Sequence, residues 1–467
     1  MTKRSVRIII ALAAVAAMVA VYFLVRGLPS QDEESPPGPV AERIRPIEVD
    51  QSEVVRVELQ GRGSDLVLNR GEAGFEVEYP YDVEFRTASI GRVSAAFSRL
   101  VANRIVSEDP ESPAEFGFAP PQATATYTLA DGTSNTIEIG NQTPNQNGYY
   151  FRVAGDPTVY VASDFYIEPF LLRVDDLRDR SLPNIPLESI TYFRLERRDA
   201  PTIEISRRIE IETEEDPFVS QFAGLVMNQP YERTRGVASD RFQELLESLP
   251  QFSVDQFVAE EPADLSTYGL NPPVAELVMA NDEDSIHYLI GEAGEMGGRY
   301  IKQPDESAVY TARGDFDFLD AAAFTLVDKF ALIPNIQDVS AFRIEGPDTV
   351  YLGSIEREPG AEEDDDPEAT YFLDGEQIPE DPFKNFYQVL IGVLFDAELR
   401  EPVEFEPEVT ISYEMTDGTT RSIQLVPYDE NFYAVFQDGL AEFLASRRQV
   451  QRVFDGAADL LEGDFES

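Results

Sequence analysis

Phe116-Gly117-Phe118-Ala119-Pro120-Pro121 is the stretch that decides the fold, because it returns as Tyr268-Gly269-Leu270-Asn271-Pro272-Pro273, 152 residues later (268 minus 116). The shared pattern is aromatic, Gly, apolar, any residue, Pro, Pro. Glycine permits a positive φ and the prolines favour an extended backbone, so we predict structural turns leading into strands rather than a recognition surface. The residues assigned to these turns are Gly117, Pro120, Pro121, Gly269, Pro272 and Pro273.

Matching residues surround both turns at nearly the same spacing. Leu182-Pro183-Asn184-Ile185 returns as Ile333-Pro334-Asn335-Ile336, and Ile139-Gly140 returns as Ile290-Gly291. Self-similarity at a fixed period is the sequence signature of repeated structural units. We therefore predict a duplicated module in this chain.

A third and more divergent copy begins near Val339. Its first predicted strand, residues 339–344, resembles residues 190–195 and residues 54–59, and each of the three segments contains an arginine. The third copy lacks the Gly-apolar-x-Pro-Pro turn, so we interpret it either as diverged or as a terminal cap of the array.

We predict the same order of elements in each copy: a β-hairpin, a helix, an antiparallel meander and a closing helix. Residues 75–79 alternate apolar and polar side chains with period two, which indicates a strand. Asp131-Gly132 and Asp417-Gly418 have the composition of tight hairpin turns. Apolar residues at helical spacing indicate the closing helices: Ile167, Phe170, Leu171, Val174 and Leu177 in the first copy, Leu319, Ala323, Leu326 and Phe330 in the second, and Val450, Val453, Phe454 and Leu461 in the third.

Hairpins and helices that come in blocks, rather than in alternation, are typical of the α+β class. The predicted fold is therefore α+β, with an N-terminal transmembrane helix followed by three tandem repeats of antiparallel sheet packed with helices. The predicted organisation is a cytoplasmic tip and membrane anchor over residues 1–26, a flexible acidic and proline-rich tether over 27–49, and repeats over 50–185, 186–336 and 337–467, the last divergent.

The N-terminal segment decides the expected location. Residues 8–25 are 18 uncharged residues, which at 1.5 Å per residue span about 27 Å, close to the hydrocarbon thickness of a bilayer. Lys3, Arg4 and Arg7 precede them and favour a cytoplasmic N-terminus. We therefore expect a single-pass protein of the inner membrane whose bulk lies in the periplasm or its equivalent. A cleaved signal peptide is the alternative, although residues 23–26 offer no small-x-small cleavage site.

Composition excludes several classes of function. The chain has 37 Lys and Arg residues against 87 Asp and Glu residues, and its net charge of -50 repels nucleic acids and anionic lipid headgroups. The absence of cysteine excludes disulfides, thiolate metal sites and cysteine nucleophiles. The preference for arginine over lysine fits either a high-salt habitat or a GC-rich genome.

Three local features have both a functional and a structural interpretation. His287, the only histidine, lies in an alternating strand without a partner nearby in sequence, so we expect a structural or surface role. The acidic run at residues 362–366 lacks the spacing of a calcium-binding loop, which indicates a solvated loop. Aromatic residues of the predicted strands are interpreted as sheet core rather than as a glycan-stacking platform: Tyr149, Tyr150, Phe151, Tyr160, Tyr300 and Tyr310.

The familiar catalytic motifs are missing from this sequence. It contains no Gly-x-Ser-x-Gly elbow, P-loop, dinucleotide-binding glycine fingerprint or His-Glu-x-x-His. We therefore expect a protein that is not an enzyme, and we assign no catalytic, cofactor-binding or metal-binding residue. A carboxylate-dependent hydrolase is the remaining enzymatic hypothesis, because the distance between two carboxylates cannot be inferred from their sequence spacing.

The Tyr268 turn, followed by Ile290-Gly291 and Tyr300, resembles the bacterial domain of unknown function 4340 family. The resemblance covers nearly the whole chain after the tether. The chain departs from the family at Phe75, where members often have Trp, and in the third copy, which lacks the Pro-Pro turn. No catalytic residue carries over from the family.

The resemblance implies an accessory role beside ABC-type export systems of the gliding-motility kind. We therefore expect an extracytoplasmic binding or scaffold protein whose partners are envelope membrane proteins, including ABC transporter subunits, and whose residues 8–25 contact the lipid bilayer. Repeats in series present an extended surface on which partners can be bridged. The alternative function is a carbohydrate-binding or envelope-polymer-binding module.

Overall fold

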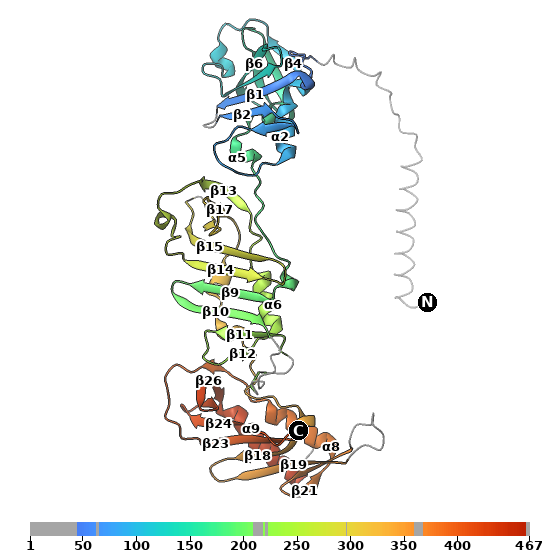
Figure 1. Ribbon diagram of the computed structural model, residues 1–467, viewed down its shortest axis with the longest axis vertical. Helices are drawn as coiled ribbons and strands as arrows, with labels where there is room; N and C mark the ends of the chain where they lie inside the picture. Colours follow the sequence, from blue (N-terminus) through green and yellow to red (C-terminus); the bar gives the residue numbers. More distant parts are fainter. Residues whose placement is uncertain are drawn as a thin grey trace, which may run out of the picture. The chain divides into compact units, whose positions relative to one another are not determined.

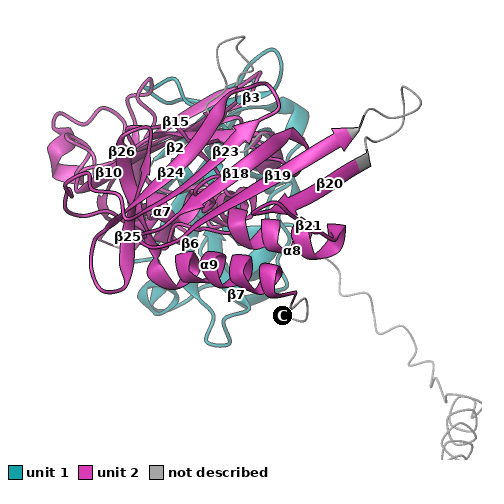
Figure 2. Ribbon diagram, turned by 90° about the horizontal axis from the view of Figure 1, so that it is seen from below, with its two compact units in different colours: residues 1–179 teal, residues 180–467 magenta. Residues whose placement is uncertain are grey.

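The computed structural model describes most of the chain after the predicted tether. The described residues fall into two compact units, residues 1–179 and residues 180–467 (Figure 2). The described ranges are 44–61, 65–208, 218–219, 223–295, 297–358 and 368–463.

Several sequence predictions concern residues outside these ranges. The predicted anchor at residues 8–25, most of the tether and the acidic run at residues 362–366 are among them. Within the described ranges, none of the helices has both the length and the apolar character needed to cross a membrane.

The first unit contains an eight-stranded antiparallel sheet with the order β3-β2-β1-β5-β6-β7-β8-β4. Its strands are β1 (Val54–Gly61), β2 (Leu66–Arg70), β3 (Phe75–Val77), β4 (Arg104–Ser107), β5 (Ala123–Leu129), β6 (Ser134–Gln142), β7 (Gly148–Val153) and β8 (Val159–Ser163). Its α-helices are α2 (Thr87–Ser94), α3 (Ala96–Arg99), α4 (Asp164–Ile167) and α5 (Val174–Leu177).

The second sheet, which belongs to the second unit, has nine strands in the order β12-β11-β10-β9-β14-β15-β16-β17-β13. The strands are β9 (Tyr192–Arg197), β10 (Ala200–Arg207), β11 (Leu225–Gln229), β12 (Arg235–Gly236), β13 (Val254–Ala259), β14 (Ala275–Ala280), β15 (Ser285–Ala293), β16 (Arg299–Lys302) and β17 (Val309–Ala312). The α-helices that accompany it are α6 (Ser239–Glu247) and α7 (Ala323–Leu326).

The third sheet, also in the second unit, again has nine strands, in the order β21-β20-β19-β18-β23-β24-β25-β26-β22. The strands are β18 (Val339–Glu345), β19 (Val350–Glu358), β20 (Glu368–Leu373), β21 (Glu376–Ile378), β22 (Ala397–Glu398), β23 (Val409–Met415), β24 (Thr420–Pro427), β25 (Phe432–Gln437) and β26 (Leu440–Ser446). The α-helices are α8 (Glu380–Ile391) and α9 (Arg447–Glu462).

The three sheets follow one connection scheme. The strand orders of the second and third sheets agree position by position, and that of the first sheet differs only by lacking the outermost strand. Figure 1 shows each of the three sheets, coloured blue to cyan, green to yellow and orange to red. The predicted α+β arrangement of antiparallel sheets in tandem is therefore confirmed.

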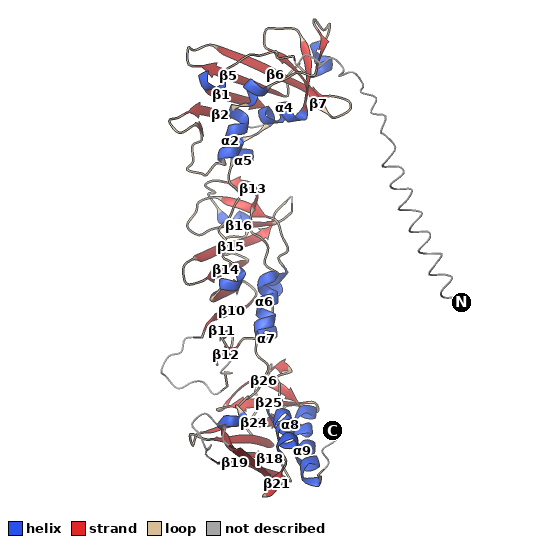
Figure 3. Cartoon of the chain, turned by 90° about the vertical axis from the view of Figure 1, so that its right-hand side faces the viewer, coloured by secondary structure: helices blue, strands red, loops and turns tan. Residues whose placement is uncertain are grey.

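Helices cover one face of each sheet. In the third sheet α8 and α9 lie side by side along that face (Figure 3). Strand β23 shows the resulting alternation, since Val409, Ile411, Tyr413 and Met415 are buried while the residues between them are not. Over β18, β19 and β23 the other face carries half-buried and exposed side chains, and we call it the open face of the third sheet.

The closing helices differ between copies. The predicted closing helix of the third copy is confirmed as α9, in which Val450 and Val453 are buried. A single closing helix is wrong for the second copy, which forms a 3-10 helix over Asp317–Asp320 and then α7, and it is also wrong for the first copy. The chain there forms α4, a 3-10 turn over Glu168–Leu171 and α5. Pro169 stands in the middle of this segment, and a proline inside a helix removes a backbone donor and clashes with the preceding turn.

Candidate functional site

The two Pro-Pro turns have the same backbone conformation. Each follows a 3-10 helix, Pro113–Phe116 in the first copy and Leu265–Tyr268 in the second. Gly117 and Gly269 then adopt φ values of 83° and 65°. A Cβ atom at Gly117 would lie 2.6 Å from the backbone nitrogen of Asn141. Glycine is therefore required both by the positive φ and by the lack of room for a Cβ atom.

The repeated Ile-Gly pair fits against these same turns. A Cβ atom at Gly140 would lie 2.1 Å from the carbonyl oxygen of Phe116, and one at Gly291 would lie 2.2 Å from that of Tyr268. The turn thus packs directly against the backbone of β6 in the first copy and of β15 in the second. This contact explains why the two motifs recur together in the sequence.

Aromatic pairs and prolines complete both turns. The ring centroids of Phe116 and Tyr150 are 5.0 Å apart, and those of Tyr268 and Tyr300 are 5.1 Å apart, both edge to face. The peptide bonds that precede Pro120 and Pro272 are cis. Pro121 and Pro273 are half-buried beside them. All six turn residues chosen from the sequence therefore lie in two matching structural joints.

The third copy replaces this joint. Strand pairing aligns Ile139, Ile290 and Leu425, so Val426 stands where the first two copies have glycine. Val426 is buried in a small core with Ala434, Phe436 and Leu444. A side chain thus fills the space that a carbonyl group occupies in the other copies.

The structure places the other sequence candidates, His287 and the six aromatic residues, in strands of the first two sheets. His287 Nε2 lies 3.2 Å from Glu276 Oε2 of the neighbouring strand, a partner that sequence proximity did not reveal. None of the six strand aromatics considered as a glycan platform is exposed. Phe151, Tyr160 and Tyr310 are buried, while Tyr149, Tyr150 and Tyr300 are half-buried.

A polar cluster, which we call the junction cluster, joins the second and third sheets within the second unit. Arg235 of β12, only 3% exposed, donates to Glu442 of β26 and to Gln437 of β25. The Nε to Oε2 distance in the ion pair is 3.1 Å. The guanidinium also lies 4.8 Å from the ring centre of Phe443 and 5.8 Å from that of Phe395.

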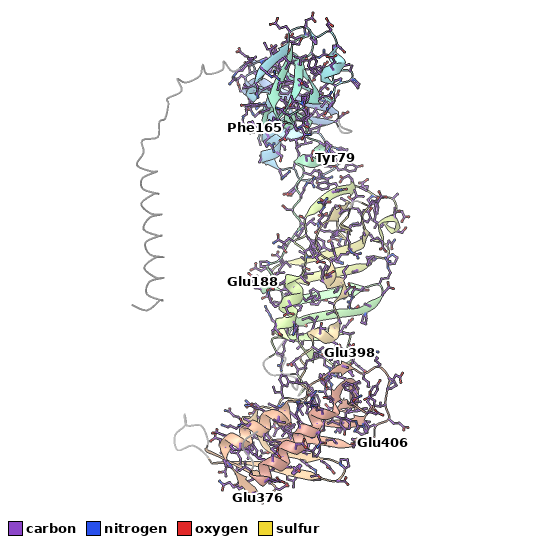
Figure 4. The ribbon with its side chains drawn as sticks, turned by 180° about the vertical axis from the view of Figure 1, so that it is seen from behind. Tyr79, Phe165, Glu188, Glu376, Glu398 and Glu406 are labelled. Atoms are coloured by element: carbon purple, nitrogen blue, oxygen red, sulfur yellow. The ribbon has the colours of Figure 1, made fainter. Side chains whose placement is uncertain are left out.

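Tyr231 extends the junction cluster. Its hydroxyl group donates to Glu398 Oε1 over 2.6 Å, and burial together with this carboxylate strongly raises the pKa of Tyr231. Glu398 lies at the end of the third sheet that contacts the second (Figure 4). The backbone N–H of Glu232 donates to Glu442 Oε1 over 2.6 Å. The ionisable groups of the cluster are thus engaged with one another, which suits a structural role.

Burial shifts the pKa of a lysine and a carboxyl group beside the junction cluster, and that of a second carboxyl group elsewhere. Burial lowers the pKa of Lys329 to about 8, and its ammonium group contacts the Phe324 carbonyl oxygen and ring. Burial also raises the pKa of Asp328 and, at a separate position, that of Glu306. Each of these carboxyl groups interacts with a lysine, Lys329 or Lys302, rather than with a second acid. Two acids do interact at Asp315 and Asp317, where the hydrogen bond and charge of Asp315 raise the pKa of Asp317, but both residues are exposed. The buried carboxyl groups thus differ from the paired carboxylates of a glycosidase.

The register of the sheets confirms the sequence alignment of residues 54–59, 190–195 and 339–344. Val57, Phe193 and Phe342 pair with Tyr127, Met279 and Tyr413, which occupy matching positions. Arg194 and Arg343 are therefore equivalent, but Arg56 lies two residues earlier, at the position of Tyr192 and Ala341. The three arginines therefore share a face of the sheet but not a position, because a difference of two residues keeps a side chain on the same face.

The side chain at this shared position differs among the three sheets. Arg56 contacts Glu58 over 2.7 Å, Asn69 over 2.7 Å and Glu78 over 3.1 Å. Tyr192 is half-buried at the same place in the second sheet. Ala341 in the third sheet leaves a cavity of about 640 Å³, which we call the Ala341 hollow. Its lining includes Arg343, Leu352, Ser354, Asp374, Ser412 and Glu414.

A second cavity of about 820 Å³ lies beside the first turns of α9. Arg447 donates to the Tyr433 hydroxyl over 2.9 Å, and Tyr433 donates to Glu408 over 2.8 Å. Burial and the Glu408 carboxylate raise the pKa of Tyr433 to about 12. Phe454 of α9 packs against the hairpin opposite, where a Cβ atom at Gly346 would lie 2.7 Å from its ring. This packing fixes the hairpin between β18 and β19 against α9.

Clusters of metal ligands were a further possibility in so acidic a chain. The part of the chain that the structure describes contains no group of three or more His, Asp or Glu side chains placed to hold a metal ion. The acidic run at residues 362–366 lies outside that part.

Comparison with known families agrees with the repeat architecture. The family described as Domain of unknown function (DUF4340) matches residues 76–273 and, in a second overlapping match, residues 235–384. Together the matches extend over residues 76–384, more than half of the 467 residues. The chain therefore belongs to the DUF4340 family, as its sequence resemblance indicated. No curated protein and no solved structure matches the chain.

Proposed function

We propose that this chain is a membrane-anchored extracytoplasmic protein that binds and scaffolds components of an ABC-type envelope export system. The observation that carries the proposal is the recurrence of one sheet topology three times, with helices on one face and polar side chains on the other. Modules in series offer several similar surfaces, which suits a protein that contacts more than one partner.

The sequence supports the anchor. Residues 8–25 are uncharged and follow three basic residues, the pattern of a helix whose N-terminus stays in the cytoplasm. The net charge of -50 supports an exterior position that neither nucleic acid nor anionic headgroups would attract. Fractionation of cells should therefore recover the full chain with the inner membrane, and a variant without residues 1–28 should be absent from that fraction.

The junction cluster supports the scaffold role. Arg235 and Glu442 tie the second and third sheets together, so the second unit can present the open faces of both sheets to partners in a fixed relation. Fixed spacing matters for bridging, because two linked sites reinforce one another only when their geometry permits both to be occupied.

Crosslinking in intact membranes tests the proposal. Mild crosslinking of the full chain, followed by identification of the captured proteins, should recover subunits of an ABC transporter. The matched control is the variant without residues 1–28, which should lose that capture. Recovery of an envelope polymer without transporter subunits would contradict the transporter role and favour the alternative, a polymer-binding module.

A further inference from the structure

The Ala341 hollow has the chemistry of a site from which a cation is missing. Strand pairing aligns it with the environment of Arg56 in the first sheet. Leu68 and Gly353 are equivalent because each pairs with the core residue of the first strand. Ser354 therefore matches Asn69, and Asp374 matches Glu78.

The equivalence of Glu78 and Asp374 is supported by the backbone. The N–H of Glu78 donates to the carbonyl oxygen of Val67 over 2.8 Å, and the N–H of Asp374 donates to that of Leu352 over 2.8 Å. Val67 and Leu352 occupy the same place in the two sheets. Both acids thus stand at the same edge of the open face.

In the first sheet these positions hold a guanidinium group. Arg56 Nη1 donates to Asn69 Oδ1 over 2.7 Å and to Glu78 Oε2 over 3.1 Å. The pKa of Glu78 is lowered by its hydrogen bonds from Asn69 and Arg56. The first sheet therefore supplies its own arginine to these two positions, one an amide and one an acid.

In the third sheet Asp374 keeps the acid of Glu78, Arg343 stands where the first sheet has Glu58, and the arginine of position 56 is absent. Ala341 replaces Arg56, and a second acid, Glu414, pairs directly with Ala341 across the strands. Within the described ranges neither Asp374 nor Glu414 forms an ion pair. Asp374 Oδ1 accepts a hydrogen bond from the backbone N–H of Leu352 over 2.8 Å. Arg343, which also lines the hollow, is paired with Glu345 over 3.0 Å, so neither Asp374 nor Glu414 has a cation of its own in the described part of the chain.

We propose that the Ala341 hollow binds an arginine side chain of a partner protein, which takes the place that Arg56 fills in the first sheet. The volume of about 640 Å³ accommodates the side chain and part of its peptide. Leu352, 50% exposed, gives the aliphatic part of the arginine an apolar surface, and Asp374 and Glu414 face a planar group with several donors. This inference extends the proposed binding role but depends on neither the anchor nor the transporter.

A peptide titration tests this inference on the full chain. The probe is an acetylated and amidated pentapeptide with arginine at its centre and glycine elsewhere, observed by ligand-detected NMR. The reference peptide carries citrulline, which has nearly the same shape without the charge. We expect saturable binding of the arginine peptide and at least about tenfold weaker binding of the citrulline peptide. Equal binding of the two would overturn the proposal.

Two substitutions locate the binding. Ala341→Arg supplies the cation from within the chain and should abolish binding of the arginine peptide. Asn385→Arg adds the same charge on α8, on the helix side of the same sheet, and should leave binding unchanged. Binding that survives Ala341→Arg, or that both variants weaken equally, would show a general attraction of cations to an acidic chain and would overturn the proposal.

A third substitution tests the equivalence of the two sheets. Arg56→Ala should open a second hollow beside Asn69 and Glu78 and add a second binding site for the arginine peptide. This gain keeps the proposal testable if Ala341→Arg does not fold. An unchanged number of sites in Arg56→Ala would contradict the equivalence on which the inference stands.

Discussion

Arg235 of β12 and Glu442 of β26 form a buried ion pair across the boundary between the second and third sheets, with the arginine 3% and the glutamate 13% exposed in their side chains. The two residues are 207 positions apart in the chain. The pair therefore couples two copies of the repeat through contacts that neither copy makes alone.

Removing one partner of this pair should destabilise the second unit. Arg235→Ala leaves Glu442 without its cation in a water-poor site, and breaking a buried pair in this way costs about 3–5 kcal/mol. Chemical denaturation followed by circular dichroism measures the loss. The matched control is Arg241→Ala, which breaks the exposed pair with Glu244 and should cost less than about 1 kcal/mol. Equal losses in the two variants would contradict the structural role.

Two glycines of the first unit should respond to alanine with opposite sign. Gly140→Ala places a methyl group against the Phe116 carbonyl oxygen, and such overpacking costs about 1–3 kcal/mol. Gly91 lies in α2 with open space around it, so Gly91→Ala should raise stability by about 0.4–1 kcal/mol. Thermal unfolding of both variants measures the two changes in stability. Destabilisation by Gly91→Ala would contradict the open space around Gly91 in α2.

The depressed pKa of Lys329 predicts a pH dependence of stability. The folded state releases this proton near pH 8, whereas an unfolded lysine keeps it to about 10.4. Between these values the unfolded state binds more protons, so the free energy of unfolding should rise with pH. The group is partly exposed, so the gain should stay well below the maximal slope of about 1.4 kcal/mol per pH unit.

Lys329→Met should remove that rise between pH 8 and 9.5. Lys384→Met is the control, because Lys384 pairs with Glu380 on the surface and its raised pKa leaves it charged across this window. Denaturant titrations at several pH values measure both. A rise that persists in Lys329→Met would assign the effect to another group.

The net charge of -50 predicts that salt stabilises the fold. Added salt shortens the Debye length from about 10 Å at 0.1 M to about 3 Å at 1 M, which screens the repulsion among surface carboxylates. The midpoint of thermal unfolding should therefore rise over this range of sodium chloride. Sucrose at equal osmolality is the control for solvent exclusion, and an unfolding midpoint indifferent to salt would remove the interpretation of a high-salt habitat.

The parts of the fold that follow local rules could be predicted from the sequence. The Pro-Pro turns recur because Gly117 and Gly269 need a positive φ, and the hairpin turn at Asp417-Gly418 falls between β23 and β24 as its composition indicates. Helix α9 also follows from apolar residues at helical spacing, two of which are Val450 and Val453.

Relationships between distant strands could not be predicted in this way. The groups on neighbouring strands that face Arg56 and Ala341 depend on strand pairing, which spacing along the sequence does not define. The partner of His287 lies on the adjacent strand, and the junction cluster combines residues of two copies. Such contacts leave no periodic signal in a single sequence. The Ala341 hollow is an example, because the sequence does not show that the space beside Ala341 is left open.

One hydrophobic core runs through the second and third sheets without interruption, from Ile185 to Leu460, while the first sheet has a core of its own. The three repeats should thus unfold as two cooperative units, the first repeat alone and the last two together. Melting should show two events rather than three. A destabilising mutation in either of the last two copies should then affect both, so neither copy can be lost without consequences for the other.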